Sequence, residues 1–288
     1  MSSSWYPSEQ YQKVAKANLL AYAKNAENYD RIETCVVSHR CQLMLERDID
    51  EILHMLHSSI DKDIYALDAC GGSGNVALKL LERGVKVVLC DISSELIEIF
   101  KSKCRDRGFS AEPICQEIGY FLSTTDKKFD LIIFSSALHH IEDYISVLQL
   151  ASARLSPGGM IYTVFDGVKR GFLARVVLRA DYVVFKVLHH PSDIFPALIR
   201  RLKKMKSELS SSTSKEISNL TEENIGMLAE YRALRGIDDF VLVDKMQQQG
   251  LTIIWHKRYP DARYALFRFF LRFLRISTSF KLLMACER

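Results

Sequence analysis

The spacing of hydrophobic residues changes along the chain. From about residue 11 to 57, apolar residues recur every three or four positions, which predicts a helical lead-in over residues 1–60. Short apolar runs then alternate with amphipathic stretches, a pattern typical of strands and helices in a mostly parallel sheet. The predicted strands are 64–69, 86–90, 111–115, 129–134 and 160–165, and the predicted helices are 74–83, 93–107 and 142–154.

This alternation stops after residue 165. Residues 166–235 have the pattern of helices joined by a serine-rich stretch, Ser207–Ser218, and are interpreted as a helical cap or insertion. Residues 236–288 then complete the sheet. The predicted fold class is therefore α/β: a Rossmann-like, doubly wound sheet of about seven strands, with residues 61–165 as its core. The last predicted elements are a helix at 237–249, a strand at 251–255, a helical segment at 262–276 and a strand at 280–286.

Small residues gather where the first strand should end and the first helix begin. Residues 67–75 have the sequence LDACGGSGN. Glycines here let backbone N–H groups and a helix N-terminus approach a polar ligand group closely. Asp91 ends the second strand, where a carboxylate can accept both hydroxyls of a ribose. An adenine nucleoside site is predicted, although Gly72-x-Gly74-x-x-Ala77 followed by Asp91 also fits a nicotinamide enzyme.

Two downstream motifs bear on these alternatives. Residues 129–141 have the sequence FDLIIFSSALHHI, and residues 155–159 have the sequence LSPGG. With the glycine turn and Asp91, they resemble, in order and spacing over residues 64–165, the motifs of class I S-adenosylmethionine-dependent methyltransferases. A nicotinamide enzyme would leave both segments without a role.

The resemblance implies S-adenosylmethionine as cofactor, S-adenosylhomocysteine as product, and roles for the matching residues. Asp68 would orient the glycine loop near the methionine end of the cofactor. Asp91 would hold the ribose, and Ile92 would pack on the adenine. Glu117 would face the adenine amino group, and Ser135 would lie beside the methionine moiety.

The same resemblance places Gly71, Gly72 and Gly74 along the cofactor. Cys70 stands where many members have the first glycine of the loop. The ubiquinone and menaquinone C-methyltransferases also have a small residue other than glycine there, so Cys70 is kept among the expected cofactor-binding residues.

His139 and His140 follow the fourth predicted strand. A histidine there could act as general base for an acceptor hydroxyl or amine, and packing or loop hydrogen bonding is the structural alternative. A sulfonium methyl is already electrophilic, so a base is needed only when the nucleophile must lose a proton. The predicted function is methyl transfer to an oxygen, nitrogen or carbon atom of a small, partly hydrophobic molecule.

Two other functional classes stay open. One is a binding or scaffolding protein that keeps the fold without turnover. The other is an RNA or protein methyltransferase, although the chain has neither an Asn/Asp-Pro-Pro-aromatic motif nor an appended RNA-binding module.

The composition limits the classes of partner, cofactor and cellular location that we expect. The net charge of +4 is too small to indicate a concentrated basic surface, so no nucleic acid partner is expected. The seven cysteines have no metal-ligand spacing and predict reduced thiols without a metal site. No apolar run reaches about 18 residues, and the first residues lack the apolar core of a signal peptide, so a cytoplasmic location is expected.

Residues 262–276 have an unusual pattern. Arg268, Arg272 and Arg275 fall on one helical stripe, while leucines and phenylalanines cover most of the rest. Packing under the cap and against the sheet is one interpretation. The functional alternatives are a hydrophobic acceptor pocket, a homodimer contact or peripheral docking on an anionic membrane.

Overall fold

The computed structural model describes residues 7–58, 63–189, 236–262 and 264–287. Most of the predicted cap, residues 190–235 with the serine-rich stretch, lies outside the described residues. Within the described part, no helix has the length and apolar character needed to cross a membrane.

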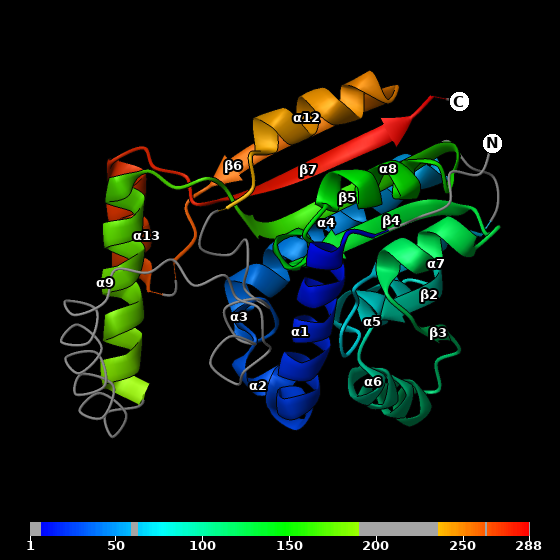
Figure 1. Cartoon of the computed structure of the whole chain (residues 1–288), viewed down its shortest axis with the longest axis horizontal. Helices are drawn as coiled ribbons and strands as arrows, with labels where there is room; N and C mark the ends of the chain where they lie inside the picture. The colour runs from blue at the N-terminus through cyan, green and yellow to red at the C-terminus, as the bar shows by residue number, and fades with distance from the viewer. Residues whose placement is uncertain (1–6, 59–62, 190–235, 263, 288) are drawn as a thin grey trace.

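A seven-stranded sheet forms the centre of the molecule, in the order β3-β2-β1-β4-β5-β7-β6 (Figure 1). Strands β1 to β5 run parallel, and β7 is antiparallel to both β5 and β6. The predicted α/β fold class is confirmed. The strands are β1 (Tyr65–Ala69), β2 (Lys86–Asp91), β3 (Glu112–Cys115), β4 (Phe129–Ser135), β5 (Leu155–Gly167), β6 (Leu251–Tyr259) and β7 (Ser279–Cys286).

Strand β5 is longer than its apolar run, because it already pairs with β4 at Leu155. The segment Pro157-Gly158-Gly159 has the composition of a turn, yet it lies within the strand. A Cβ at Gly159 would lie 2.9 Å from the carbonyl oxygen of Ser156 and 3.0 Å from that of Phe129. Glycine is therefore required there by close backbone approach, and not by a turn.

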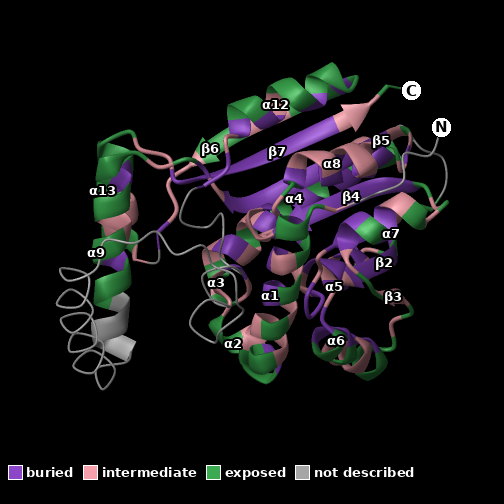
Figure 2. Ribbon diagram, viewed as in Figure 1, coloured by how far each residue is buried: buried purple, intermediate pink, exposed green. Residues whose placement is uncertain are grey.

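Helices cover both faces of the sheet, which explains why β1 and β4 are buried almost throughout (Figure 2). One core lies under α1, α7, α8 and α12, and the other under α4, α5 and α6. The short helix α7 has no counterpart among the predicted elements. The bounds are α1 (Glu9–Asn25), α4 (His39–His57), α5 (Asn75–Leu81), α6 (Ser94–Arg107), α7 (Ile118–Thr124), α8 (Tyr144–Ser152) and α12 (Asp239–Gln248).

The N-terminal lead-in is helical, as predicted, but it is not continuous. Between α1 and α4 the chain forms a 3-10 turn, Ala26–Asn28, and two short helices, α2 (Tyr29–Ile32) and α3 (Thr34–Val37). Glu33 and Ser38 have extended backbone and separate these pieces. The breaks bring α1 over one face of the sheet and α4 under the other.

Helices α9 (Phe172–His189) and α13 (Ala265–Phe273) pack on each other beyond the end of the sheet (Figure 1). The carboxylate of Asp181 in α9 accepts the backbone N–H of Tyr264 just before α13, at 3.0 Å. In α13 only Leu271 is buried. The predicted packing under the cap agrees with the contact between α13 and α9, which lies within residues 166–235, whereas in the described part of the chain the main partner of α13 is α9 and not the sheet.

Candidate functional site

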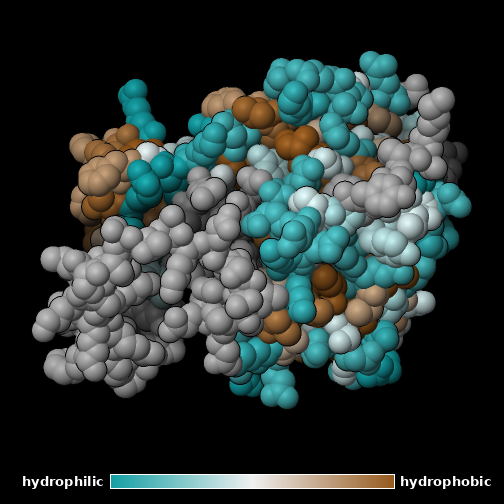
Figure 3. Space-filling view, in the orientation of Figure 1, coloured by the Kyte–Doolittle hydropathy of each residue, from teal (hydrophilic) through white to brown (hydrophobic). Residues whose placement is uncertain are grey.

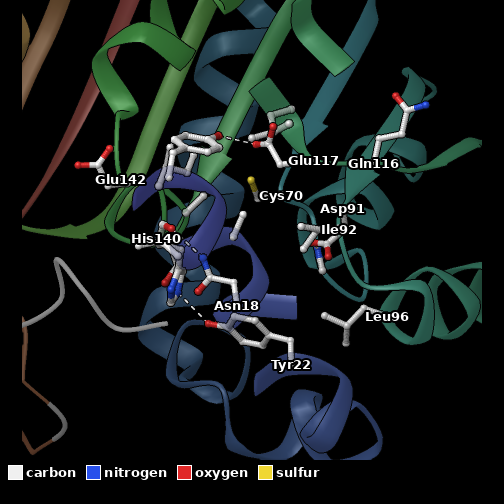
Figure 4. A pocket seen from close by; sticks show the side chains of 18 of the residues that line it. Asn18, Tyr22, Cys70, Asp91, Ile92, Leu96, Gln116, Glu117, His140 and Glu142 are labelled. Carbon is white, nitrogen blue, oxygen red and sulfur yellow. Dashed lines mark hydrogen bonds between the residues drawn. The ribbon is translucent and has the colours of Figure 1, made fainter. Parts of the chain in front are cut away.

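A pocket opens at the carboxyl ends of β1, β2, β3 and β4, beneath α1 (Figure 4). Its volume is about 690 Å³, including space open to solvent. Among the described residues, none from α9, α12 or α13 lines it, which removes support for 262–276 as an acceptor pocket. The lining residues are Tyr11, Val14, Ala15, Asn18, Tyr22, Tyr29, Cys70, Gly72, Asp91, Ile92, Leu96, Gln116, Glu117, Ile118, Ser136, Ala137, His140, Ile141 and Glu142.

The glycine turn contributes Cys70 and Gly72 to the pocket. Both have positive φ, at 58° for Cys70 and 56° for Gly72. Gly71 and Gly74 do not line the pocket and instead let the turn pack tightly from behind. A Cβ on Gly71 would lie 2.7 Å from the Asp68 carboxyl and from Leu89, and one on Gly74 would lie 2.2 Å from the ring of Phe100. All four residues shape the loop: Cys70 and Gly72 form part of the pocket wall, and Gly71 and Gly74 allow close packing behind it.

Asp68 lies behind the loop, buried at the end of β1. Its Oδ2 accepts the backbone N–H of Ala77, in the first turn of α5, at 2.9 Å. Burial raises the pKa of Asp68 to about 7, against the opposing effect of the Ala77 hydrogen bond. Asp68 therefore fixes the glycine turn to the helix that follows, and does not line the pocket.

Asp91 and Ile92 lie on the pocket wall at the end of β2. The carboxylate of Asp91 accepts the N–H of Gly72 at 2.8 Å and that of Ser93 at 2.9 Å. Ser93, not Asp91, caps α6, because its hydroxyl accepts the N–H of Leu96. Burial raises the pKa of Asp91, although these backbone hydrogen bonds oppose the shift. A carboxylate offers about four acceptor positions, so two remain for a ligand.

Glu117 lines the pocket and also caps α7. Its two oxygens accept the N–H groups of Gly119 at 2.8 Å and Tyr120 at 2.9 Å. The hydroxyl of Tyr11 in α1 donates to the same carboxylate, so Glu117 joins the N-terminal helix to the β3 edge of the pocket. Burial, followed by the Glu117 charge, raises the pKa of Tyr11.

At the end of β4 the pocket is lined by Ser136 and Ala137, and not by Ser135. Ser136 has φ 55° and donates its N–H to the Val164 carbonyl at 2.8 Å. The motif thus indicated the correct end of β4, but it selected Ser135, whereas the pocket is lined by the next residue, Ser136. Side chains alternate between the two faces of a strand, so a displacement of one residue changes the direction of the side chain.

The two histidines take different positions. His140 lines the pocket, with its Nε2 2.8 Å from the hydroxyl of Tyr22. His139 does not line the pocket. Its Nδ1 lies 2.7 Å from Oδ1 of Asp166, a fully buried carboxylate at the end of β5 that also accepts the His139 backbone N–H. This pair fixes the ring of His139 against β5.

Helix α1 supplies a row of pocket residues. Tyr11, Ala15, Asn18 and Tyr22 follow one another at spacings of three or four and so share one helix face. Asn18 is 8% exposed; its amide nitrogen donates to the His140 carbonyl, while its Oδ1 is buried without a hydrogen-bond partner. A stripe of polar and aromatic residues at helical spacing was the available signal.

In the part of the chain that the structure describes, no group of three or more His, Cys, Asp or Glu side chains could hold a metal ion.

Comparison with known protein families finds a match to a methyltransferase domain over residues 66–159. The tRNA 5-carboxymethoxyuridine methyltransferase of Escherichia coli (strain K12) is 33% identical over 129 residues, which cover 43% of this chain and 47% of that protein. A ubiquinone biosynthesis O-methyltransferase of Coxiella burnetii is 27% identical over 141 residues, covering 48% and 58%. The chain thus matches about half the length of these relatives, over the region of the pocket motifs.

The fold is shared over almost the whole chain. The plantazolicin methyltransferase structure with bound S-adenosylhomocysteine superposes with a TM-score of 0.56 at 16% identity, covering 96% of this chain and 98% of that one. Magnesium protoporphyrin IX methyltransferase from Synechocystis PCC 6803 gives 0.54 at 12% identity, covering 95% and 100%. The methyltransferase domain match covers the residues that form the glycine turn and the pocket motifs, and the fold over almost the whole chain is similar to that of solved S-adenosylmethionine-dependent methyltransferases.

Proposed function

We propose that this protein binds S-adenosylmethionine in the pocket beneath α1 and transfers its methyl group to a small, partly hydrophobic acceptor. The observation that carries the proposal is that Asp91, Cys70 and Gly72 line one pocket at the carboxyl edge of a doubly wound sheet. Nucleoside ligands of such sheets bind at this edge. In this proposal residues 61–165 form the cofactor-binding core, with α1 as its cover.

The described residues have the chemistry that this cofactor needs. Asp91 retains acceptor capacity for two ribose hydroxyls, beyond the two N–H groups it already accepts. Glycine at position 72 lets the loop lie close to Tyr29, because a Cβ there would be only 3.1 Å from the tyrosine hydroxyl oxygen. The unpartnered Oδ1 of Asn18 is a buried acceptor that a donor on the ligand would satisfy.

The remaining assignments follow from position along the pocket. We assign the adenine to the wall formed by Ile92 and Leu96, beside Gln116 and Glu117. Glu117 already caps α7 and accepts a hydrogen bond from Tyr11. In this assignment it accepts from the adenine amino group in addition to these two contacts. We assign the methionine moiety to the side of Cys70 and Ser136, with Ser135 supporting the strand end.

The cofactor supplies an electrophilic methyl group on its sulfonium, so the protein mainly has to orient both reactants. Tyr22 and Asn18 hold α1 against His140 and thereby fix the position of this histidine in the pocket wall. For an acceptor that must lose a proton, we assign the base role to His140, because it lines the pocket. His139, held by Asp166, is assigned to positioning the loop.

The relatives differ in their methyl acceptors, so the acceptor of this protein has to be argued separately from its cofactor. The named relatives act in tRNA modification, ubiquinone biosynthesis, plantazolicin methylation and magnesium protoporphyrin methylation. The small acceptor is favoured by a pocket with a largely apolar wall, which includes Val14, Ile118 and Ile141. A tRNA nucleoside is the second candidate, because the E. coli relative is 33% identical over the matched region.

Calorimetric titration of the full chain with S-adenosylhomocysteine tests cofactor binding, with NADH as the comparison ligand. Ligand at 100 times its dissociation constant should stabilise the protein by about 2.7 kcal/mol. Binding of NADH with no binding of S-adenosylhomocysteine would overturn the proposal.

Transfer is tested by incubating the protein and radiolabelled S-adenosylmethionine with fractions of a cell extract. Label in an organic-soluble, low-molecular-weight product is the expected result. Label that ribonuclease releases would establish the tRNA alternative instead. Cofactor binding without transfer to any fraction would favour a scaffold that has lost turnover.

A further inference from the structure

Helix α13 presents an exposed apolar stripe. Leu266, Phe269, Phe270 and Phe273 fall within about one third of the helix circumference, at spacings of three and four residues. Phe269 is 63% exposed and Phe273 is 76% exposed. The opposite side of the helix carries the buried Leu271. The stripe therefore faces away from the rest of the described protein.

Helix α9, which packs on α13, adds to the same end of the molecule. Phe172, at 77% exposure, lies on one side of this helix with the exposed Val176 and Val183. Figure 3 shows hydrophobic atoms gathered at the end of the molecule where α9 and α13 lie, with hydrophilic atoms beside them. Isolated exposed apolar residues are ordinary on a protein surface, but four large apolar side chains exposed along one face of a helix mark an interaction site.

The exposed charges that the structure describes on α9 and α13 have one sign. Arg272 and Arg275 are exposed beside the apolar stripe of α13, and Arg175 and Arg179 are exposed on α9. Residues 262–276 contain no acidic residue. The single acidic residue of α9, Asp181, is buried and accepts the N–H of Tyr264. Among the described residues of α9 and α13, the exposed side chains thus combine large apolar groups with charges that are all cationic.

We propose that the α9 and α13 end of this protein docks on the surface of an anionic lipid bilayer. Aromatic side chains enter the boundary between headgroups and acyl chains, while arginines bind anionic headgroups. A second copy fits this surface less well, because a two-fold symmetric contact would bring the arginines of both copies together, and the described residues of α9 and α13 offer no exposed acidic partner. The proposal is independent of the methyltransferase proposal.

Vesicle flotation of the full chain tests this docking. The vesicles are phosphatidylcholine alone, or phosphatidylcholine with about one third phosphatidylserine. Wild-type protein is expected to float with the anionic vesicles at low salt, and at least about tenfold less with neutral vesicles or when salt screens the charges. Equal flotation with both vesicle types, or none with either, would overturn the proposal.

Two double variants separate the contributions of apolar and cationic residues. Phe269→Ser with Phe273→Ser, and Arg175→Glu with Arg272→Glu, should each lower anionic vesicle binding by about tenfold or more. The matched controls change exposed residues on other elements: Val37→Ser with Leu43→Ser, and Arg105→Glu with Arg107→Glu. The controls should float like the wild type. Equal loss in a control and its matched variant would overturn the assignment to α9 and α13.

Circular dichroism and S-adenosylhomocysteine binding confirm that each variant is folded, and neither depends on the lipid. Sedimentation velocity tests whether a second copy of the protein, and not a bilayer, covers this surface. A wild-type dimer that Phe269→Ser with Phe273→Ser converts to a monomer, without vesicle binding by either protein, would replace the membrane with a second copy.

Discussion

Asn18 in α1 donates its side-chain N–H to the carbonyl oxygen of His140, 122 positions later, at 2.8 Å. The other end of the same amide, Oδ1, is buried without a hydrogen-bond partner, and Asn18 is one of the residues that line the pocket. One side chain thus joins the N-terminal helix to the end of β4 and leaves an acceptor for a ligand. Tyr22, one turn later in α1, contacts the ring of the same histidine.

Replacing Asn18 with alanine should weaken S-adenosylhomocysteine binding by roughly tenfold, because the ligand loses an acceptor inside the pocket. The ligand-free protein should lose little stability, since the change removes one hydrogen bond and also one unpaired buried oxygen. Calorimetry measures the affinity, and urea denaturation measures the free energy of unfolding. An unchanged affinity would show that Oδ1 does not bind the ligand.

Asp91→Ala should weaken S-adenosylhomocysteine binding by roughly 1.5 to 3 kcal/mol, about ten- to a hundredfold, because charge-assisted hydrogen bonds to the ribose are lost. Asp106→Ala, a loss of an exposed carboxylate on α6, is the control and should bind like the wild type. Calorimetric titration provides both dissociation constants. Equal affinity in the two variants would limit Asp91 to holding the backbone of Gly72 and Ser93.

The contribution of Asp68 to the free energy of unfolding should decrease as the pH rises from 4 towards neutrality. Its pKa in the folded protein, about 7, is above its ordinary value of 3.8 because of burial. The folded state therefore holds the proton more tightly, and this contribution to stability is full below about pH 4 and lost as pH rises through 7. Asp68→Asn removes this titration and retains an oxygen for the Ala77 N–H.

The measurement is the melting temperature of both proteins at several pH values from 4 to 8. The difference between wild type and Asp68→Asn should change in favour of the variant as pH rises. Parallel curves would show that Asp68 has an ordinary pKa in the folded protein.

Gly74→Ala should cost about 3 kcal/mol or more of unfolding free energy, because φ is +88° and the new Cβ would lie 2.2 Å from the Phe100 ring. Gly84→Ala is the matched control, since Gly84 has a similar φ of +76° with no atom within 4 Å. It should cost only about 1 to 2 kcal/mol, the strain of the left-handed backbone. Urea denaturation compares the two. Similar losses would mean that Phe100 moves aside.

The buried ion pair between Lys281 and Asp48 joins β7 to α4, and the Tyr162 hydroxyl donates to the same carboxylate. Lys281→Met should cost about 3 to 5 kcal/mol, because it removes the buried partner of the Asp48 charge and leaves only the exposed Arg47, 3.6 Å away. Adding Asp48→Asn removes that charge and still accepts from Tyr162, so the double variant should recover most of the loss. A double variant no more stable than Lys281→Met in urea denaturation would contradict this account.

The amino-acid sequence alone was enough to predict the type and order of most elements. Short apolar runs such as Leu131 to Phe134 favoured buried strands, because they are too short for a typical helix and rich in β-branched and aromatic residues. It also placed Cys70, Gly72, Asp91, Ile92, Glu117 and His140 at one site, because the carboxyl ends of parallel strands meet at one edge of the sheet.

Packing in three dimensions selected which of two neighbours faces the pocket. Ser136 lines it and Ser135 does not, and His140 lines it while His139 turns to Asp166. Identical residues adjacent in a motif give no local signal of direction, because the left-handed turn at Ser136 changes where the side chains point.

The three-dimensional arrangement also fixed what covers the pocket and what stays exposed. Tyr11 contacts Glu117, 106 positions away, through a return of the chain that no local pattern encodes. The amphipathic stripe of α13 was evident in the sequence, but its exposed direction was not. Periodicity shows that a helix has an apolar face, whereas only the packing of α13 on α9 determines whether that face meets the core or the outside.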